Sequence, residues 1–76
     1  MSYKVVGMKH STGTYEGNAY DNTLVYCTYE DSKVSGVGTI VHKLKTSAFN
    51  TCPCKLGEQI EVMYDRYGNV TQLYKG

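Results

Sequence analysis

The sequence predicts an all-β fold of five short strands in one small domain, covering residues 1–76. A chain of 76 residues has room for one hydrophobic core and no second one. Short runs with period-two alternation or β-branched residues recur along it, separated by Gly, Asn, Asp and Ser. No segment shows sustained helical periodicity, so strands and turns account for the pattern.

The first strand is expected over residues 3–10, where β-branched residues occur without helical spacing. Gly7 inside this run predicts a bulge or bend of the kind that lets small barrels turn corners. Residues 11–21 then gather Gly13, Gly17 and other turn formers around two tyrosines. We therefore expect a hairpin arm or loop there.

The clearest strand is residues 22–30, where two sets of side chains alternate. Leu24, Tyr26 and Thr28 share one face, and the residues between them share the other. After a polar turn, residues 39–45 repeat the alternation and place Lys43 and Lys45 together on one face. The lysines of the third strand therefore share one face, opposite Ile40, His42 and Leu44.

Residues 46–57 predict a loop with a short helix, because residues 47–50 suffice for about one helical turn. Two further strands, residues 58–65 and 70–74, flank a turn in which Gly68-Asn69 can supply positive φ. Three strands, a short helical or loop connection and a closing hairpin match the five-stranded oligonucleotide-binding (OB) barrel. An SH3-like barrel is the structural alternative.

The charge of the chain is concentrated in its middle. The net charge is only +1, yet residues 32–57 contain no Asp or Glu and four lysines, Lys33, Lys43, Lys45 and Lys55. A basic segment of this kind is a candidate anion-facing surface.

Several functional classes find little support in the sequence. No Gly-rich phosphate cradle or nucleophile motif occurs, so we expect no enzyme, no cofactor and no small-molecule substrate. No apolar run reaches the roughly 20 residues of a membrane span, and no secretory leader is recognisable, which favours a cytoplasmic protein without a membrane partner. Three cysteines, an odd number, predict reduced thiols.

A zinc-dependent domain is a further alternative. Cys27, Cys52 and Cys54 with His10 or His42 would supply thiolate and imidazole ligands. The one-residue gap between Cys52 and Cys54 is shorter than the usual zinc knuckle, so structural thiols are the preferred interpretation.

The aromatic residues are 8 Tyr and 1 Phe, and tyrosine offers a flat stacking face with a polar tip. Proteins that bind single strands stack bases on such rings while cationic side chains follow the phosphates. The candidate phosphate contacts are Lys9, Lys43, Lys45 and Arg66, and the candidate base contacts are Tyr15, Tyr20, Tyr26 and Phe49. The competing expectation for Tyr26, Tyr64 and Tyr74 is that they fill the core.

Residues 11–30, STGTYEGNAYDNTLVYCTYE, resemble the first hairpin of the single-stranded-DNA-binding proteins of filamentous phages and related mobile elements. There too, Ser and Gly and a later Gly-x-x-Tyr precede an apolar strand. The resemblance implies a small OB barrel that dimerises and coats single-stranded DNA, with Tyr20 at the position of a base-contacting tyrosine. The family carries arginines in this arm, where this chain has Thr14, Glu16 and Asn18.

The leading hypothesis is therefore a non-sequence-specific single-stranded-DNA-binding protein of a phage or mobile element, acting as a homodimer. The alternative is a small protein-interaction or structural accessory module, because tyrosine is also enriched at protein interfaces. The first predicts binding that weakens strongly with salt, and the second predicts no response to oligonucleotide.

Overall fold

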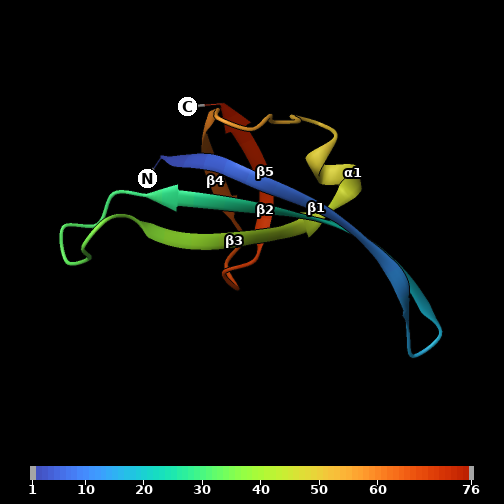
Figure 1. The fold of residues 1–76 in the computed structure, drawn as a ribbon. Coiled ribbons are helices and arrows are strands. Elements are labelled where there is room, and N and C mark those ends of the chain that lie inside the picture. The colour runs from blue at the N-terminus through green and yellow to red at the C-terminus, as the bar shows by residue number, and fades with distance from the viewer. Residues whose placement is uncertain (1, 76) are drawn as a thin grey trace.

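The computed structural model describes residues 2–75 and contains five strands and one short helix within that range. The elements in chain order are β1 (Tyr3–Tyr15), β2 (Asn18–Tyr29), β3 (Gly38–Lys45), α1 (Thr46–Phe49), β4 (Gln59–Tyr64) and β5 (Val70–Lys75). The all-β prediction is confirmed, and so is the short helical connection between the third and fourth strands (Figure 1).

All five strands form one antiparallel sheet in the order β3-β2-β1-β4-β5. In Figure 1, β4 and β5 cross behind β1, β2 and β3 at a steep angle, so the sheet folds back over itself. The two end strands, β3 and β5, contact each other, but no ladder joins them in the described part of the chain. The sheet is therefore open where a closed barrel would have its last pairing.

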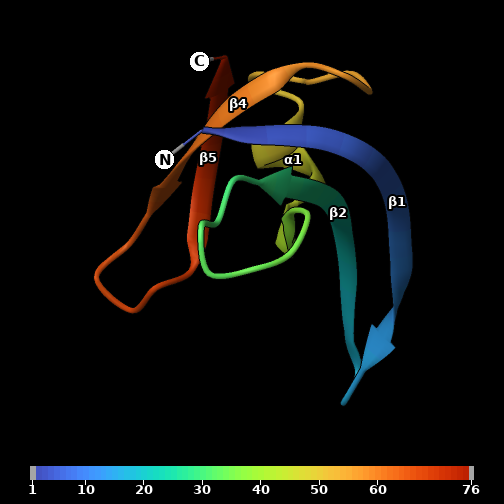
Figure 2. The same cartoon turned by 60° about the vertical axis from the view of Figure 1, so that its left-hand side comes forward.

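The largest difference from the expected boundaries is the arm. Strand one was expected to end at residue 10 and strand two to begin at residue 22, yet β1 and β2 stay paired out to Tyr15 and Asn18. Polar Thr and Ser residues here continue the ladder without a core, since the backbone bonds of two strands do not require one. Figure 2 shows this hairpin curving away from the rest of the molecule.

Two local expectations about glycine are confirmed. The β1–β2 register shifts between Val5 and Gly7, which is the predicted bulge. Gly68 has a φ of 83°, as the tight turn between β4 and β5 requires.

The core lies between the two halves of the folded sheet. Val25 and Leu44 face it from β2 and β3, and Ile60 and Leu73 face it from β4 and β5. Tyr3 is the buried tyrosine of this cluster. Tyr64 and Tyr74 were expected to fill the core, but both are exposed. Tyr74 alternates with the inward Leu73. Tyr64 lies on the core side but at its edge, with its ring centroid 6.4 Å from that of His42.

The helix α1 closes one end of this core. Ala48 and Phe49 are partly buried against it. Among residues 2–75 there is no helix with the length and apolar character needed to cross a bilayer.

Candidate nucleic-acid interface

The register of β1, β2 and β3 brings most of the predicted binding residues onto one face of the sheet. Cross-strand partners in a ladder point to the same side, and burial on β2 and β3 alternates accordingly. We name the outward side the lysine–tyrosine face, which comprises Lys9, Tyr15, Tyr20, Leu24, Tyr26, Val41, Lys43 and Lys45. Six of the eight predicted residues are in this set.

The lysines of this face stand in cross-strand rows. Lys9 pairs with Leu24, and Leu24 pairs with Lys43, so one row carries two ammonium groups around an apolar side chain. In the next row Asn22 pairs with Lys45. Directly opposed side chains in such ladders are about 5 Å apart at Cβ, so three lysines lie within one small area.

Two tyrosine rings of the face lie over glycines of the neighbouring strand. Tyr26 pairs with Gly7, and a Cβ built on Gly7 would be 3.5 Å from Tyr26 Cβ, an ordinary contact. Tyr20 pairs with Gly13, where a built Cβ would come closer than 3.0 Å to the ring. Each ring therefore packs against bare backbone, and at Gly13 a larger residue would disturb that contact.

The outer part of the face belongs to the arm. Tyr15 is 70% exposed and Tyr20 is 41% exposed, the values expected of rings available to a ligand. Together with Ser11, Asn22, Leu24 and Lys43 they line a shallow hollow of about 490 Å³. This hollow joins the arm tyrosines to a lysine of β3.

Acidic side chains are missing from the outward positions of β1, β2 and β3 within the described residues. Asp21 follows Tyr20 in the strand and so belongs to the opposite side of the arm, where His10 Nε2 contacts its carboxylate. Glu16 lies in the turn at the tip. The charged side chains at the outward positions of these three strands are therefore all basic, in a chain whose net charge is only +1.

Phe49 and Arg66 are placed elsewhere. Phe49, a predicted base contact, lies apart from the tyrosines: its ring is partly buried against the core and lines a groove with Met8, Lys9 and Cys54. Arg66 lies in the exposed β4–β5 turn with its guanidinium 5.0 Å from the Tyr67 ring centroid. That turn borders Lys45 through Asp65 and Asn69, which line a common hollow with it.

The inward face of β3 holds a buried histidine. His42 is 2% exposed, and its ring meets Tyr3 edge-on at 4.6 Å between centroids. Its Nε2 has no hydrogen-bond partner among the described residues, and burial lowers the pKa of this side chain. A hydrogen bond with Tyr64, together with burial, raises the pKa of Tyr3 to about 12.

Two of the three cysteines belong to the core. Cys27 and Cys54 are buried, and burial raises the pKa of Cys27 to about 11 and that of Cys54 above its usual range. Within residues 2–75, no three His, Cys, Asp or Glu side chains are grouped as metal ligands would be.

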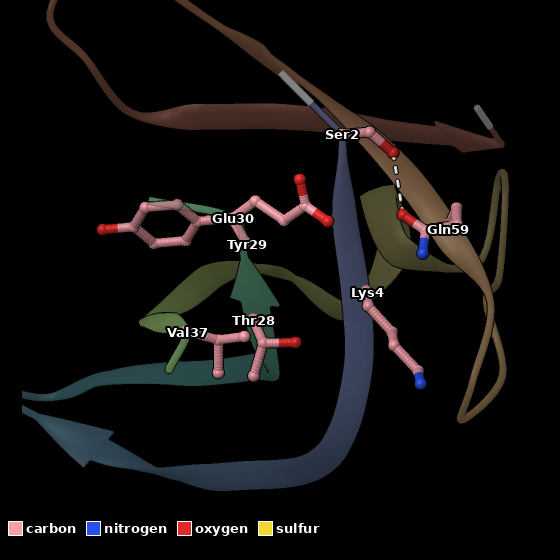
Figure 3. Close-up of a pocket in the computed structure, with 7 residues that line it drawn as sticks. All are labelled: Ser2, Lys4, Thr28, Tyr29, Glu30, Val37 and Gln59. Carbon is pink, nitrogen blue, oxygen red and sulfur yellow. Dashed lines mark hydrogen bonds between the residues drawn. The ribbon is translucent and has the colours of Figure 1, made fainter. Parts of the chain in front are cut away.

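A second hollow lies at the far end of β1 and β2 (Figure 3). It is lined by Lys4 and Glu30 together with polar groups, among them Ser2, whose hydroxyl donates to Gln59 Oε1 at 2.9 Å. In Figure 3 the Lys4 ammonium points away from the Glu30 carboxylate. Mixed charges that do not converge on one point make this hollow a poor site for an anion.

Sequence reasoning missed the residues that connect the predicted ones. Leu24 and Val41 lie between the lysines and tyrosines, and Gly7 and Gly13 support two rings. Alternation along β2 and β3 already assigned Leu24 and Val41 to their faces, but the cross-strand register was needed to align them with β1. Comparison with protein-family models, curated proteins and solved structures finds no match for this chain.

Proposed function

We propose that this protein binds single-stranded nucleic acid, without sequence specificity, on the lysine–tyrosine face. The observation that carries the proposal is the grouping of Lys9, Lys43 and Lys45 with three tyrosines on a sheet face that lacks acids. Cationic groups interleaved with exposed rings are the combination that single-strand binding uses.

The geometry supports separate roles for the aromatic and the cationic side chains. The exposed rings of Tyr15 and Tyr20 and the half-buried ring of Tyr26 offer stacking surfaces to bases, each worth about 1–3 kcal/mol in proteins that bind single strands. Lysines on β1 and β3 would neutralise phosphates on either side of those rings. Stacking accepts every base, so binding would depend little on sequence. The lysines supply charge for binding alone, and the proposal includes neither catalysis nor a cofactor.

The proposal includes a homodimer and single-stranded DNA of a phage or mobile element as the natural target. A domain of 76 residues buries a modest share of its surface, so association would add to its stability. Sedimentation equilibrium across a range of protein concentrations distinguishes a dimer of twice 8.5 kDa from a monomer.

The first test is a titration of labelled oligothymidine, followed by anisotropy at low and moderate salt, with a duplex of equal length for comparison. We expect binding that prefers the single strand and weakens as salt rises, because counterions are released from the phosphates. Equal binding to the duplex, or none at micromolar protein, would contradict the proposal.

A pair of double variants localises the site. Lys43→Ala with Lys45→Ala should weaken binding and reduce the slope of log K against log salt by about 2, roughly one per phosphate contact. Lys33→Ala with Lys55→Ala removes the same charge from exposed positions outside the face. If both pairs lose affinity equally, overall charge rather than this face governs binding.

A protein-interaction module is the second candidate, and one observation favours it. Leu24, Tyr26 and Val41 form an apolar stretch across the centre of the same face, and Val41 is 48% exposed. Exposed apolar patches often mark protein interfaces. This candidate predicts that oligonucleotide leaves the protein unaffected while substitutions at Val41 disturb association with a protein partner.

A further inference from the structure

We propose that Thr46 is a positioning residue, which holds the arm of β1 and β2 at a fixed angle to α1 through Asp21. This inference rests on the proposed function for its consequence, since the arm carries Tyr20 and the strand before Thr46 ends in Lys45. The arm here means residues 10–21.

The contact is a compact set of hydrogen bonds at the base of the arm. Asp21 Oδ1 accepts a hydrogen bond from Thr46 Oγ1 at 2.6 Å and also contacts His10 Nε2. Thr46 Oγ1 lies 3.0 Å from Thr23 Oγ1. Because Thr46 gives its single hydroxyl proton to Asp21, Thr23 must be the donor in the second bond.

The carboxylate is well matched to its donors. The hydrogen bond from Thr46, followed by that from His10, lowers the pKa of Asp21 below its usual range. The group is therefore ionised at neutral pH, and its bonds are of the charge-assisted kind, stronger than neutral ones.

The location of Asp21 gives this bond its importance. The pairing of β2 with β3 ends at Asn22 and Lys45, so from Asp21 outward the arm pairs only with itself. His10 and Asp21 both belong to the arm, whereas Thr46 begins α1. Among the described residues, the hydrogen bond that the Thr46 hydroxyl donates to Asp21 is the side-chain hydrogen bond that links α1 to the arm.

The hydrogen bond between Thr46 and Asp21, called the clamp below, lies on the side of the sheet opposite the lysine–tyrosine face. It nevertheless adjoins two proposed contact residues. Tyr20 precedes Asp21 and Lys45 precedes Thr46, and all four line one hollow of about 520 Å³. A rigid clamp would keep the Tyr20 ring and the Lys45 ammonium at a constant separation, which lowers the ordering cost of binding a strand across both.

The test uses three threonine variants of the full chain. Thr46→Val removes the hydroxyl at nearly constant volume, and Thr46→Ser restores it. Thr12→Val is the matched control, because Thr12 lies across the ladder from Asp21, is exposed and makes no side-chain hydrogen bond with the described residues. We expect Thr46→Val to weaken oligothymidine binding about fivefold with an unchanged salt slope, and the other two variants to bind as the original does.

A second measurement needs no ligand. Residual dipolar couplings of backbone amides report the orientation of the arm relative to the rest of the sheet, and we expect averaged couplings in residues 12–20 of Thr46→Val alone. Unchanged couplings in that variant would overturn the clamp. Averaged couplings with unchanged affinity would overturn its role in positioning.

The two proposals fail in different ways. If the original protein does not bind the oligonucleotide, the proposed function fails, and the couplings still decide whether Thr46 holds the arm. A fall in thermal stability with no change in couplings would assign Thr46 a purely stabilising role and contradict the clamp.

Discussion

Glu16 has a φ of 51°, in the left-handed region that most side chains avoid. Together with Gly17 at 80°, it forms the two-residue turn between the paired residues Tyr15 and Asn18. Such turns favour Asn-Gly, because Asn tolerates positive φ better than Glu does. The tip of the arm therefore has a backbone conformation that is unfavourable for Glu16.

Replacing Glu16 should make the arm more stable. We expect Glu16→Asn to stabilise the hairpin by about 0.5–1 kcal/mol, since the new side chain accepts positive φ more readily. Hydrogen exchange of the arm amides, which senses local opening, should slow accordingly. Glu16→Gln removes the same charge without easing the backbone, so equal slowing in both variants would assign the effect to charge.

His42 makes the stability of the fold sensitive to acid. Burial lowers its pKa below the value near 6.5 of the unfolded chain. Below that value the unfolded chain binds a proton more readily than the folded one does. Its contribution to stability is therefore complete above pH 6.5 and is lost as the pH falls from there through the folded pKa.

Thermal unfolding between pH 7.5 and 5 tests this dependence. We expect the melting temperature to fall in the original protein and to fall less in His42→Phe, which keeps an aromatic ring and removes the unpartnered nitrogen. Asp21, Glu58 and Asp65 have lowered pKa values and stay ionised over this range. His10 is present in both proteins, so an equal fall in both would show that His42 is not the cause.

The ladder of β1 and β2 combines two glycines with two tyrosines, and the pairs differ in space. Gly7 has room for a methyl group beside Tyr26, whereas a methyl group on Gly13 would collide with the Tyr20 ring. The end of a tyrosine side chain can move, so the ring rather than the strand should yield.

We therefore expect opposite results from the alanine variants of these two glycines. Gly13→Ala should displace the Tyr20 ring, visible as changed ring proton shifts in NMR spectra, and weaken oligonucleotide binding. Gly7→Ala should leave the Tyr26 signals nearly unchanged and stabilise the fold by about 0.5 kcal/mol through reduced freedom of the unfolded chain. Matching behaviour at both sites would show that the close approach at Gly13 has no effect.

Strand periodicity was reliable wherever one face of a strand is buried. The alternation of β2 and β3 correctly separated Tyr26 from Val25 and Cys27, and the two lysines of β3 from His42 and Leu44. Which face is inward came from the structure, where Tyr26 lies outward and not in the core. The expectation that Tyr64 and Tyr74 fill the core rested on how tyrosine commonly packs, and both side chains are exposed. Periodicity also underestimated the length of the two strands in the arm, because no core imposes a period on the polar residues there.

The molecule as a whole consists of a packed body and a projecting hairpin. Its dimensions of 43 × 25 × 23 Å reflect the arm, which leaves the body in both views (Figures 1 and 2). None of residues 13–20 is buried. The body should therefore fold without the outer arm, because almost no apolar burial is lost with it.

Shortening the arm tests this division. Replacing residues 13–20 by Asn-Gly joins the paired residues Thr12 and Asp21 through a tight turn and keeps the bond from Thr46 to Asp21. We expect the melting temperature to change by less than about 5 °C, because the core is intact, while oligonucleotide affinity falls with the loss of Tyr15 and Tyr20. Unfolding of the shortened chain would show that the arm belongs to the cooperative unit.

The sequence by itself determined the strands of the body, the bulge at Gly7, the short helix and the alternation that turns Lys43 and Lys45 outward, because these follow from local patterns of side chains. Only the tertiary structure decided the register that sets Lys9 beside Leu24 and Lys43, the inward position of Phe49, and the contact of Asp21 with Thr46. Those relations join residues from different strands, and they depend on how the sheet bends and folds over its core.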